Sequence, residues 1–325
     1  MSDLDQFRQG VGQRRVLITG ASGFIGQQLS RDFLAAGWAV HATSRRADQS
    51  WASGVQGFVV GDGAVLDHWR SALQGVEVVV HCAARVHVMR ELANDPSAEF
   101  RKANVDASLA LARAARAAGA RRFIFLSTVG VHGSSSPLGP FRASDPPAPH
   151  SAYAISKLEA ELALQNWGVA SNLEVVCIRP PLVYGPNAPG NFGRLLRIVK
   201  RRLPLPLGAV NNQRSMVSLK NLASLVLRCA DHPLAAGRVF LVSDGEDIST
   251  TALLQKLGKA CGHEPWLLPV PDIWLRGTLH LLGKPSMAEQ LLDSLQVDIT
   301  ETRQSLDWNP PQTVSEALME AAKTG

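Results

Sequence analysis

Short runs of apolar residues alternate with longer helical patterns along the first half of the chain. A glycine turn follows the first run, and Gly37 ends the helical pattern after it. We expect the apolar runs to be strands at Val16–Ile18, Ala39–Thr43, Phe58–Val60, Val78–His81, Phe123–Leu126 and Val175–Ile178. Buried strands that alternate with helices are typical of parallel sheets covered on both faces. The pattern therefore predicts an α/β fold with an open, doubly wound sheet, which binds ligands at the carboxyl ends of its strands.

This regularity does not extend over the whole chain. Residues 1–13 are polar and suggest a loose leader, and residues 180–193 are rich in proline, glycine and asparagine. Helical patterns follow at 194–202 and 219–231, and a strand pattern at 239–243. We expect residues 14–180 to form the nucleotide-binding domain, with 217–243 returning to it, and 181–325 to form a smaller, interleaved substrate lobe.

The composition is that of a globular protein, with 46% apolar and 19% charged residues. No run of about eighteen apolar residues predicts a membrane span. The four cysteines, Cys82, Cys177, Cys229 and Cys261, lie far apart without a Cys-x-x-Cys pair, so we expect reduced thiols and a cytoplasmic protein. We expect no metal.

Two segments could contact larger partners. The helix at 194–202 carries five cations, and we interpret them as the solvated face of an amphipathic helix. Nucleic-acid binding is disfavoured because interleaved aromatic residues are missing there. The stretch from Trp266 to Leu282 is rich in proline, tryptophan and leucine, and we expect packing within the lobe rather than membrane contact.

The turn after the first strand has the spacing of a nucleotide-binding loop. In Thr19-Gly-Ala-Ser-Gly-Phe-Ile-Gly26, the glycines Gly20, Gly23 and Gly26 allow a tight turn and a close approach to a pyrophosphate at the helix N-terminus. Dinucleotide sites often place an acid at the end of the second strand, but Ser44, Arg45 and Arg46 stand there. An arginine can pair with a 2′-phosphate, which favours NADP(H) over NAD(H). Alternatively, the arginines only cover the adenine.

A second constellation carries proton chemistry. Tyr153 and Lys157 are four residues apart in Ser151-Ala-Tyr-Ala-Ile-Ser-Lys157, which places the phenol and the ammonium on one helix face. The cation should lower the pKa of the phenol, because it stabilises the phenolate. Such a phenol can exchange a proton with a substrate oxygen.

Together these motifs resemble the extended short-chain dehydrogenases/reductases, a family of sugar-nucleotide epimerases, dehydratases and ketoreductases with a Rossmann-type fold. The resemblance also covers Gly61-Asp62, His81-Cys-Ala-Ala84, Ser127-Thr128 and Arg179-Pro-Pro-Leu-Val-Tyr-Gly-Pro186. It implies that Thr128 is the catalytic hydroxyl beside Tyr153 and Lys157. The tyrosine of the family's Ser/Thr-x-x-Val-Tyr-Gly motif is His132 here.

The resemblance also implies a binding role for further residues. Asp62 would bond the adenine amino group, Ala83 and Ala84 would line the cofactor groove, and Lys157 would hold the nicotinamide ribose. The cofactor set implied in full is Gly20, Ser22, Gly23, Phe24, Ile25, Gly26, Ser44, Arg45, Arg46, Asp62, Gly63, Ala83, Ala84, Ser127, Tyr153, Lys157, Pro180 and Val183.

For the substrate, the resemblance implies a UDP-sugar. Arg214 would pair with the diphosphate, Asn191 would follow the Val-Tyr-Gly-Pro loop into the site, and the backbone at Leu205 and Leu207 would hold uracil. Arg85, His87 and Thr128 would lie beside the sugar; the alternative for Arg85 and His87 is an ordinary loop. Family likeness further implies a homodimer through helices near 100–118 and 152–166.

The sequence narrows the reaction. Val129 and Gly130 follow Thr128, where dehydratases of the family carry an acidic pair, so we exclude 4,6-dehydration. Segments 84–89, 240–247 and 294–298 resemble the bacterial UDP-N-acetylquinovosamine branch, which implies reduction of a 4-keto sugar nucleotide for surface polysaccharide. The alternatives are a UDP-HexNAc or UDP-glucose 4-epimerase with tightly bound NAD and, in another class, a nicotinamide-sensing regulator, which would tend to lack Tyr153 and Lys157.

Overall fold

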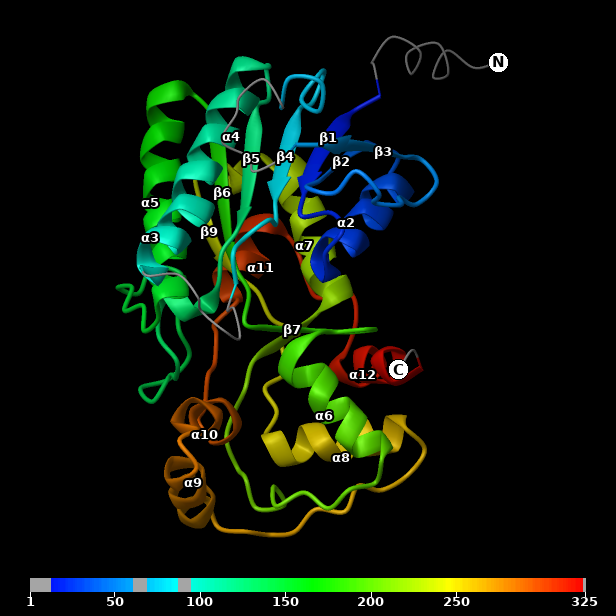
Figure 1. The fold of residues 1–325 in the computed structure, drawn as a ribbon, viewed down its shortest axis with the longest axis vertical. Helices are drawn as coiled ribbons and strands as arrows, with labels where there is room; N and C mark the ends of the chain where they lie inside the picture. The colour runs from blue at the N-terminus through cyan, green and yellow to red at the C-terminus, as the bar shows by residue number, and fades with distance from the viewer. Residues whose placement is uncertain (1–12, 61–68, 87–94, 324–325) are drawn as a thin grey trace. The chain divides into compact units, whose positions relative to one another are not determined.

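The main sheet has seven strands in this computed structural model, which describes residues 13–60, 69–86 and 95–323 (Figure 1). Their order is β3-β2-β1-β4-β5-β6-β9, and the pairs β1–β2, β1–β4, β2–β3, β4–β5 and β6–β9 are parallel. The strands are β1 (Arg15–Thr19), β2 (Ala39–Ser44), β3 (Val55–Val59), β4 (Val78–His81), β5 (Arg122–Leu126), β6 (Glu174–Arg179) and β9 (Val239–Leu241). The predicted α/β, Rossmann-type doubly wound sheet is confirmed.

Burial of the strands explains why the apolar runs located most of them. All residues of β4 and β5 are buried, as expected for strands covered on both faces. The edge strand β3 is largely exposed and begins at Val55 rather than at Phe58. Its first residues are placed by pairing with β2, where Val55 lies opposite Val40, and not by an apolar signal of their own.

Helices connect the strands and form most of the second half of the chain. Helix α6 begins at Gly190 rather than at Arg194 and buries Leu196 and Val199 while Arg194 and Arg197 are exposed, which confirms an amphipathic helix. The helices are α2 (Phe24–Ala35), α3 (Pro96–Arg101), α4 (Ala107–Ala117), α5 (Ala152–Ser171), α6 (Gly190–Lys200), α7 (Leu219–Asp231), α8 (Thr250–Ala260), α9 (Asp272–Leu281), α10 (Pro285–Leu292), α11 (Thr300–Leu306) and α12 (Val314–Lys323). Shorter turns are a π-helical turn η2 (Lys102–Asp106) and the 3₁₀ turns η3 (Val129–Val131) and η4 (Pro233–Ala235).

By packing, the chain divides into two compact units. Unit 1 comprises Met1–Leu126 and Glu159–Val176, and unit 2 comprises Ser127–Leu158 and Cys177–Gly325. The domain boundary expected after residue 180 stays a prediction. Unit 2 has its own hydrophobic core and a parallel strand pair that the sequence did not reveal, β7 (Leu182–Tyr184) and β8 (Met216–Ser218).

One expectation about unit 2 is wrong. Leu267, Val270, Leu275 and Leu279 pack on the core as expected, but Trp266, Ile273, Trp274, Leu281 and Leu282 are exposed. Lobe packing therefore accounts for only part of this apolar stretch. In the described part of the chain, no helix combines the length and the apolar character needed to cross a membrane.

Candidate active site

The glycine turn after β1 has the geometry of a phosphate cradle. Gly20 has a φ of +65°, and its carbonyl oxygen accepts a hydrogen bond from the N–H of Gly23 at 2.9 Å. Gly23 is the N-cap of α2, and no side chain caps this helix. The N–H groups of its first turn can therefore bind an anion, assisted by the helix dipole.

Two close approaches make glycine necessary in this turn. A Cβ at Gly26 would lie 2.3 Å from the carbonyl oxygen of Gly20, and a Cβ at Gly20 would lie 2.8 Å from the nitrogen of Ala83. The first contact packs the start of α2 against the turn. The second packs the turn against the segment that follows β4, so the carboxyl ends of β1 and β4 form one continuous backbone surface. The chain order of the strands reverses at this point, where doubly wound sheets bind nucleotides.

The other predicted cofactor residues of unit 1 lie at expected positions along the strands. Ser22 is exposed, and Phe24 and Ile25 are half-buried in the first turn of α2. Arg45 and Arg46 are exposed directly after β2, and the hydroxyl of buried Ser44 accepts a hydrogen bond from the N–H of Arg46 at 3.0 Å. Asp62 and Gly63 lie outside the described residues. All these cofactor roles stay predictions.

A buried chain of hydrogen bonds supports the segment after β4, and the sequence gave no sign of it. Nδ1 of His81 lies 2.6 Å from Oγ1 of Thr19, and its Nε2 lies 2.9 Å from the hydroxyl of Ser108. The hydroxyl of Thr19 also accepts the N–H of Ala83 at 3.3 Å. The ring stacks on Phe125 at 5.9 Å between centroids. His81 therefore joins the ends of β1 and β4 to helix α4.

Asn104, in the π-helical turn η2, holds Arg85 at the end of the same segment. Its side-chain oxygen accepts the N–H of Arg85 at 2.8 Å, and its amide donates to the carbonyl of Arg85 at 3.1 Å. The guanidinium of Arg85 lies 5.6 Å from the ring centroid of Phe100. Ala83 and Ala84 are half-buried beside it. His87 lies outside the described residues.

In unit 2, Thr128 caps a turn and keeps a proton to donate. Its Oγ1 accepts the N–H of Gly130 at 3.1 Å at the start of η3, and the N–H of Val129 donates to the carbonyl of Pro180 at 2.9 Å. The neighbouring hydroxyl of Ser127 is buried without a hydrogen-bond partner among the described residues. Val183 is half-buried in β7.

The turn of Thr128 lies against the start of α5, which carries Tyr153 and Lys157. A Cβ at Gly130 would lie 3.4 Å from Oγ1 of Thr128 and 3.6 Å from Cβ of Ala154, the residue next to Tyr153. Ser151 begins the helix and accepts the N–H of Ala154 at 3.2 Å. Lys157, one turn after Tyr153, is buried. The structure therefore brings the predicted alcohol and phenol into one neighbourhood.

The protonation of Tyr153 differs from the expectation. Burial raises the pKa of the Tyr153 phenol to about 12, whereas the neighbouring ammonium was expected to lower it. Desolvation penalises the charged phenolate more strongly than expected from spacing alone. A phenol with this pKa is neutral at pH 7 and is a proton donor.

His132, which replaces the motif tyrosine, is also buried. Nη1 of Arg179 lies 2.8 Å from its Nε2, and its ring stacks on Phe141. Burial and the charge of Arg179 lower the pKa of His132 to about 4. The imidazole is thus a neutral acceptor at pH 7 and supports the loop after Thr128.

The predicted substrate residues of unit 2 differ in their contacts. The backbone of Leu205 is engaged on both sides, since its N–H donates to Trp266 at 2.9 Å and its carbonyl accepts from Leu268 at 2.8 Å. Leu205 therefore cannot offer its backbone to uracil, which corrects that expectation. The carbonyl of Leu207 accepts the hydroxyl of Thr251 at 2.6 Å. Asn191 is exposed in α6 and donates to Gln290.

Arg214 has the environment of an anion-binding residue. Its guanidinium donates to the carbonyl of Asp293 at 2.9 Å. Burial lowers its pKa, and the charge of Asp293 partly offsets this effect. The carboxylate of Asp293 pairs with Arg276 at 2.5 Å, so Arg214 has only the carbonyl of that residue as a hydrogen-bond partner among the described contacts. A half-buried cation of this kind gains from an incoming anion.

Comparison with known proteins agrees with this architecture. Residues 16–243 match the model of the NAD dependent epimerase/dehydratase family. A UDP-glucose 4-epimerase of Vibrio cholerae is 40% identical over 314 residues, which are 95% of each chain. The structure of a UDP-N-acetylglucosamine 4-epimerase from Bacillus cereus matches 96% of this chain and 99% of its own with a TM-score of 0.78 and 19% identity. The structure of RMD from Pseudomonas aeruginosa complexed with NADPH matches 96% and 98% of the two chains with a TM-score of 0.72 and 22% identity. The chain belongs to the NAD dependent epimerase/dehydratase family.

Proposed function

We propose that this protein is an NADPH-dependent reductase that converts the 4-keto group of a UDP-2-acetamido-2,6-dideoxy-hexos-4-ulose to an alcohol. The product would be UDP-N-acetylquinovosamine or its 4-epimer, used for bacterial surface polysaccharide. The observation that carries the proposal is the packing of the Thr128 turn on the first turn of α5, beside a phenol that is neutral at pH 7.

The residues present fit a nicotinamide dinucleotide. The backbone cradle made by Gly20, Gly23 and Gly26 leaves room for a pyrophosphate that any side chain there would remove. Arg45, exposed at the end of β2, would pair with a 2′-phosphate, which favours NADP(H), with NAD(H) as the alternative. The bound nicotinamide would supply the hydride.

The chain's own residues would handle the proton. Tyr153, neutral at pH 7, would donate its proton to the carbonyl oxygen as the hydride arrives at carbon 4. Thr128 would donate a hydrogen bond to the same oxygen, since its lone pair already accepts from Gly130. The buried ammonium of Lys157 would stabilise the phenolate that forms and would hold the nicotinamide ribose.

The substrate assignment is supported by the chemistry of unit 2. Arg214 would bind the diphosphate, with Asn191 and the backbone at Leu207 nearby in the nucleotide-sugar site. Arg85, fixed by Asn104, would contact the sugar. Dehydration is disfavoured because Val129, which directly follows Thr128, is a buried apolar residue where an acid would be needed. A homodimer through α4 and α5 is part of the proposal.

A second candidate is favoured by one observation. The relative from Vibrio cholerae, 40% identical over nearly the whole chain, is a UDP-glucose 4-epimerase. A 4-epimerase would keep NAD bound and would need Tyr153 as a base before it acts as an acid. A neutral phenol supports the reductase instead, since a ketone reductase starts with the proton in place.

The two candidates differ in a simple experiment. The purified protein is incubated with the 4-keto-6-deoxy sugar nucleotide and NADPH or NADH, and separately with UDP-GlcNAc or UDP-glucose without added cofactor. The proposal expects oxidation of NADPH that depends on the keto sugar, with the C4 alcohol as product. Conversion of a UDP-sugar to its 4-epimer without added cofactor, together with no consumption of NADPH, would establish the epimerase in its place.

A further inference from the structure

A set of large apolar side chains is exposed at one end of unit 2. Among them Trp266 is 63% exposed, Trp274 71% and Leu281 91%. We call the docking surface the set formed by Leu203, Trp266, Leu268, Ile273, Trp274 and Leu281. Tryptophans and leucines exposed together usually mark a site of association with another molecule or a membrane.

Helix α9 shows why this surface is not part of the core. Its inner face packs Leu275 and Leu279 on the core of unit 2. Ile273, Trp274 and Leu281 follow the helical repeat along the opposite side, where all three are exposed. A helix that is apolar on both faces and packed on only one has a second face left for a partner.

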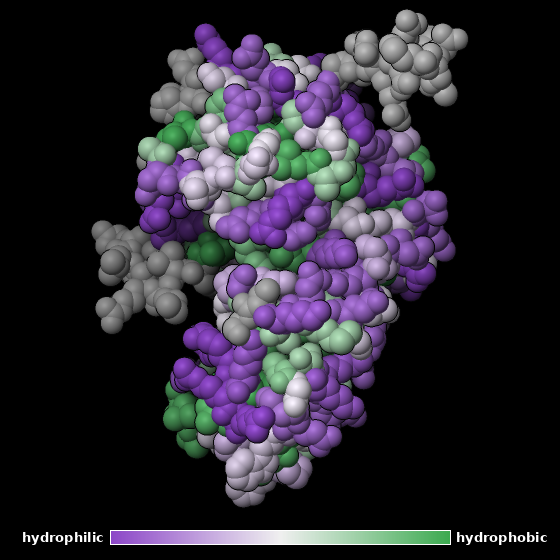
Figure 2. All heavy atoms as spheres, turned by 90° about the vertical axis from the view of Figure 1, so that its right-hand side faces the viewer, coloured by the Kyte–Doolittle hydropathy of each residue, from purple (hydrophilic) through white to green (hydrophobic). Residues whose placement is uncertain are grey.

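The other residues of the docking surface lie on two paired segments that lead towards α9. Leu205 pairs with Trp266 and Leu268 through backbone hydrogen bonds of 2.9 and 2.8 Å, so the segments after α6 and after α8 run side by side along the edge of the unit (Figure 1). Leu205 and Leu267 pack inwards, while Leu203, Trp266 and Leu268 face outwards. Figure 2 shows green, hydrophobic residues beside purple, hydrophilic ones at this end of the unit.

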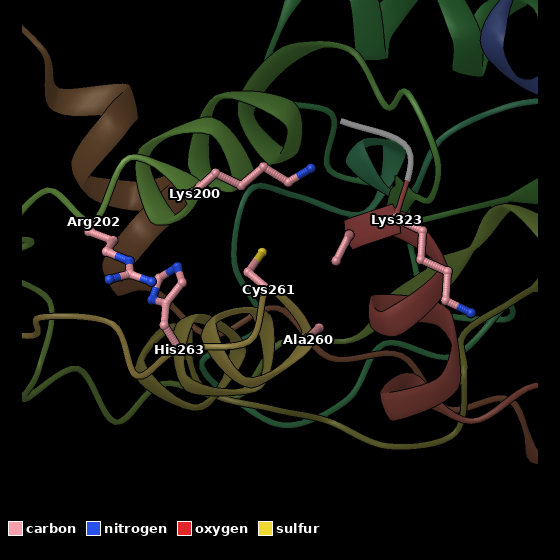
Figure 3. A pocket seen from close by; sticks show the side chains of 7 residues that line it. Lys200, Arg202, Ala260, Cys261, His263 and Lys323 are labelled. Carbon is pink, nitrogen blue, oxygen red and sulfur yellow. The ribbon is translucent and has the colours of Figure 1, made fainter.

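A basic pocket lies where these two segments begin. Its cavity of about 490 Å³ is lined by Lys200, Arg202, Cys261, His263 and Lys323, and none of its lining residues carries a carboxylate. Figure 3 shows Lys200 and Cys261 between the ends of α6, α8 and α12, with Arg202 and His263 to one side. Arg201 and Arg202, exposed next to Leu203, join the pocket to the docking surface, and exposed Lys284 follows α9.

We propose that this end of unit 2 docks on the surface of an anionic phospholipid bilayer. Apolar side chains and tryptophans enter the boundary between headgroups and acyl chains, and neighbouring cations bind lipid phosphates. The docking surface supplies the first, and Arg201, Arg202 and Lys284 with the basic pocket supply the second. Helix α9 has 10 residues, a length that suits lying in the interface and not crossing the bilayer.

Charge argues against a second copy of this chain as the occupant. A two-fold symmetric interface brings the same patch of both copies together, so the cations around the apolar residues would face one another. An anionic bilayer neutralises these cations instead. The proposal does not depend on which nucleotide sugar the enzyme uses.

Sedimentation with vesicles tests the proposal. The full-length protein is mixed with vesicles of phosphatidylcholine alone or of phosphatidylcholine with phosphatidylglycerol. We expect binding to the anionic vesicles that weakens with added salt. Ile273→Ser with Trp274→Ser should weaken it about tenfold or more, and Arg201→Gln or Lys284→Gln about fivefold each. Leu138→Ser, which changes an exposed leucine elsewhere in unit 2, and Lys220→Gln are the matched controls and should bind like the unchanged protein.

Turnover of the nucleotide sugar should be the same in all these variants, which separates this test from that of the proposed function. Two results would overturn the proposal. One is equal retention on neutral and anionic vesicles. The other is a loss of dimers in Ile273→Ser with Trp274→Ser while vesicle binding is unchanged, which would assign the surface to a second copy.

Discussion

Nη1 of Arg179 lies 2.8 Å from Nε2 of His132, and this contact fixes the protonation state of a buried imidazole. A guanidinium can only donate, so Nε2 accepts and Nδ1 carries the ring proton. The charge of Arg179 and burial both penalise a second proton, and the pKa falls from 6.5 to about 4. Asp145 opposes this shift more weakly.

This contact makes the stability depend on pH. The unfolded chain binds a proton at His132 near pH 6.5, whereas the native protein does so only near pH 4. The free energy of unfolding should therefore fall as the pH is lowered from about 7 through this window, by roughly 3 kcal/mol at most from this residue. In His132→Gln the fall should be smaller by that amount, as measured by urea unfolding at several pH values.

The control for this measurement is His280→Gln, which changes an exposed histidine. His41 is also buried with a lowered pKa, so some pH dependence of the same sign should remain in every variant. Parallel stability curves for the unchanged protein and His132→Gln would show that the proton uptake lies elsewhere.

Local patterns predicted the strands and the glycine turn, because burial on both faces and the need for a backbone cradle leave a mark on neighbouring residues. The strands β1, β2, β4, β5 and β6 were found in this way. Contacts between distant residues leave no such mark. His132 meets Arg179 across 47 positions and Thr19 meets His81 across 62, and only the folded sheet brings each pair together. The pKa of Tyr153 was missed for the same reason, since its burial depends on tertiary packing.

Replacing Tyr153 by Phe should lower kcat by about a hundredfold or more, because no other described group is assigned to donate the proton. Cofactor affinity should change little. Since the pKa of Tyr153 is about 12, its protonation should not limit reduction at any pH below about 10. The matched control is Tyr184→Phe, the only other tyrosine, whose hydroxyl donates to buried Asp244 at 2.7 Å. That variant should lose stability but keep kcat; the reverse pattern would exchange the roles of the two tyrosines.

Gly26→Ala tests the phosphate cradle. The new Cβ would lie 2.3 Å from the carbonyl oxygen of Gly20, so the turn must move. We expect the dissociation constant of the nicotinamide dinucleotide, measured by fluorescence quenching, to rise about tenfold or more, with a stability loss of about 2 kcal/mol. Gly277→Ala is the control, because no atom lies within 4 Å of its Cβ position in α9. It should stabilise the helix by about 0.5–1 kcal/mol, and equal cofactor affinity in both variants would rule out the cradle.

Asn104→Ala tests the support of Arg85. Both hydrogen bonds to the backbone of Arg85 would be lost, so the segment after β4 should loosen. If Arg85 contacts the sugar, KM for the nucleotide sugar should rise about tenfold, while the dissociation constant of the cofactor stays the same. Asn104→Asp keeps the acceptor and loses the donor, so its KM should be intermediate. A rise confined to the cofactor constant would assign the segment to the cofactor alone.

Arg45 decides between the two nicotinamide cofactors. It is exposed directly after β2, and the hydroxyl of Ser44 holds the following turn by accepting the N–H of Arg46. A charge-assisted hydrogen bond to a 2′-phosphate is worth about 1.5–3 kcal/mol, so Arg45→Ala should weaken NADPH binding about tenfold or more. Binding of NADH should change about twofold or less, because it has no phosphate at that position. Arg46→Ala, measured in the same titrations, shows whether its neighbour shares the role, and an equal loss for both cofactors would mean that Arg45 only covers the adenine.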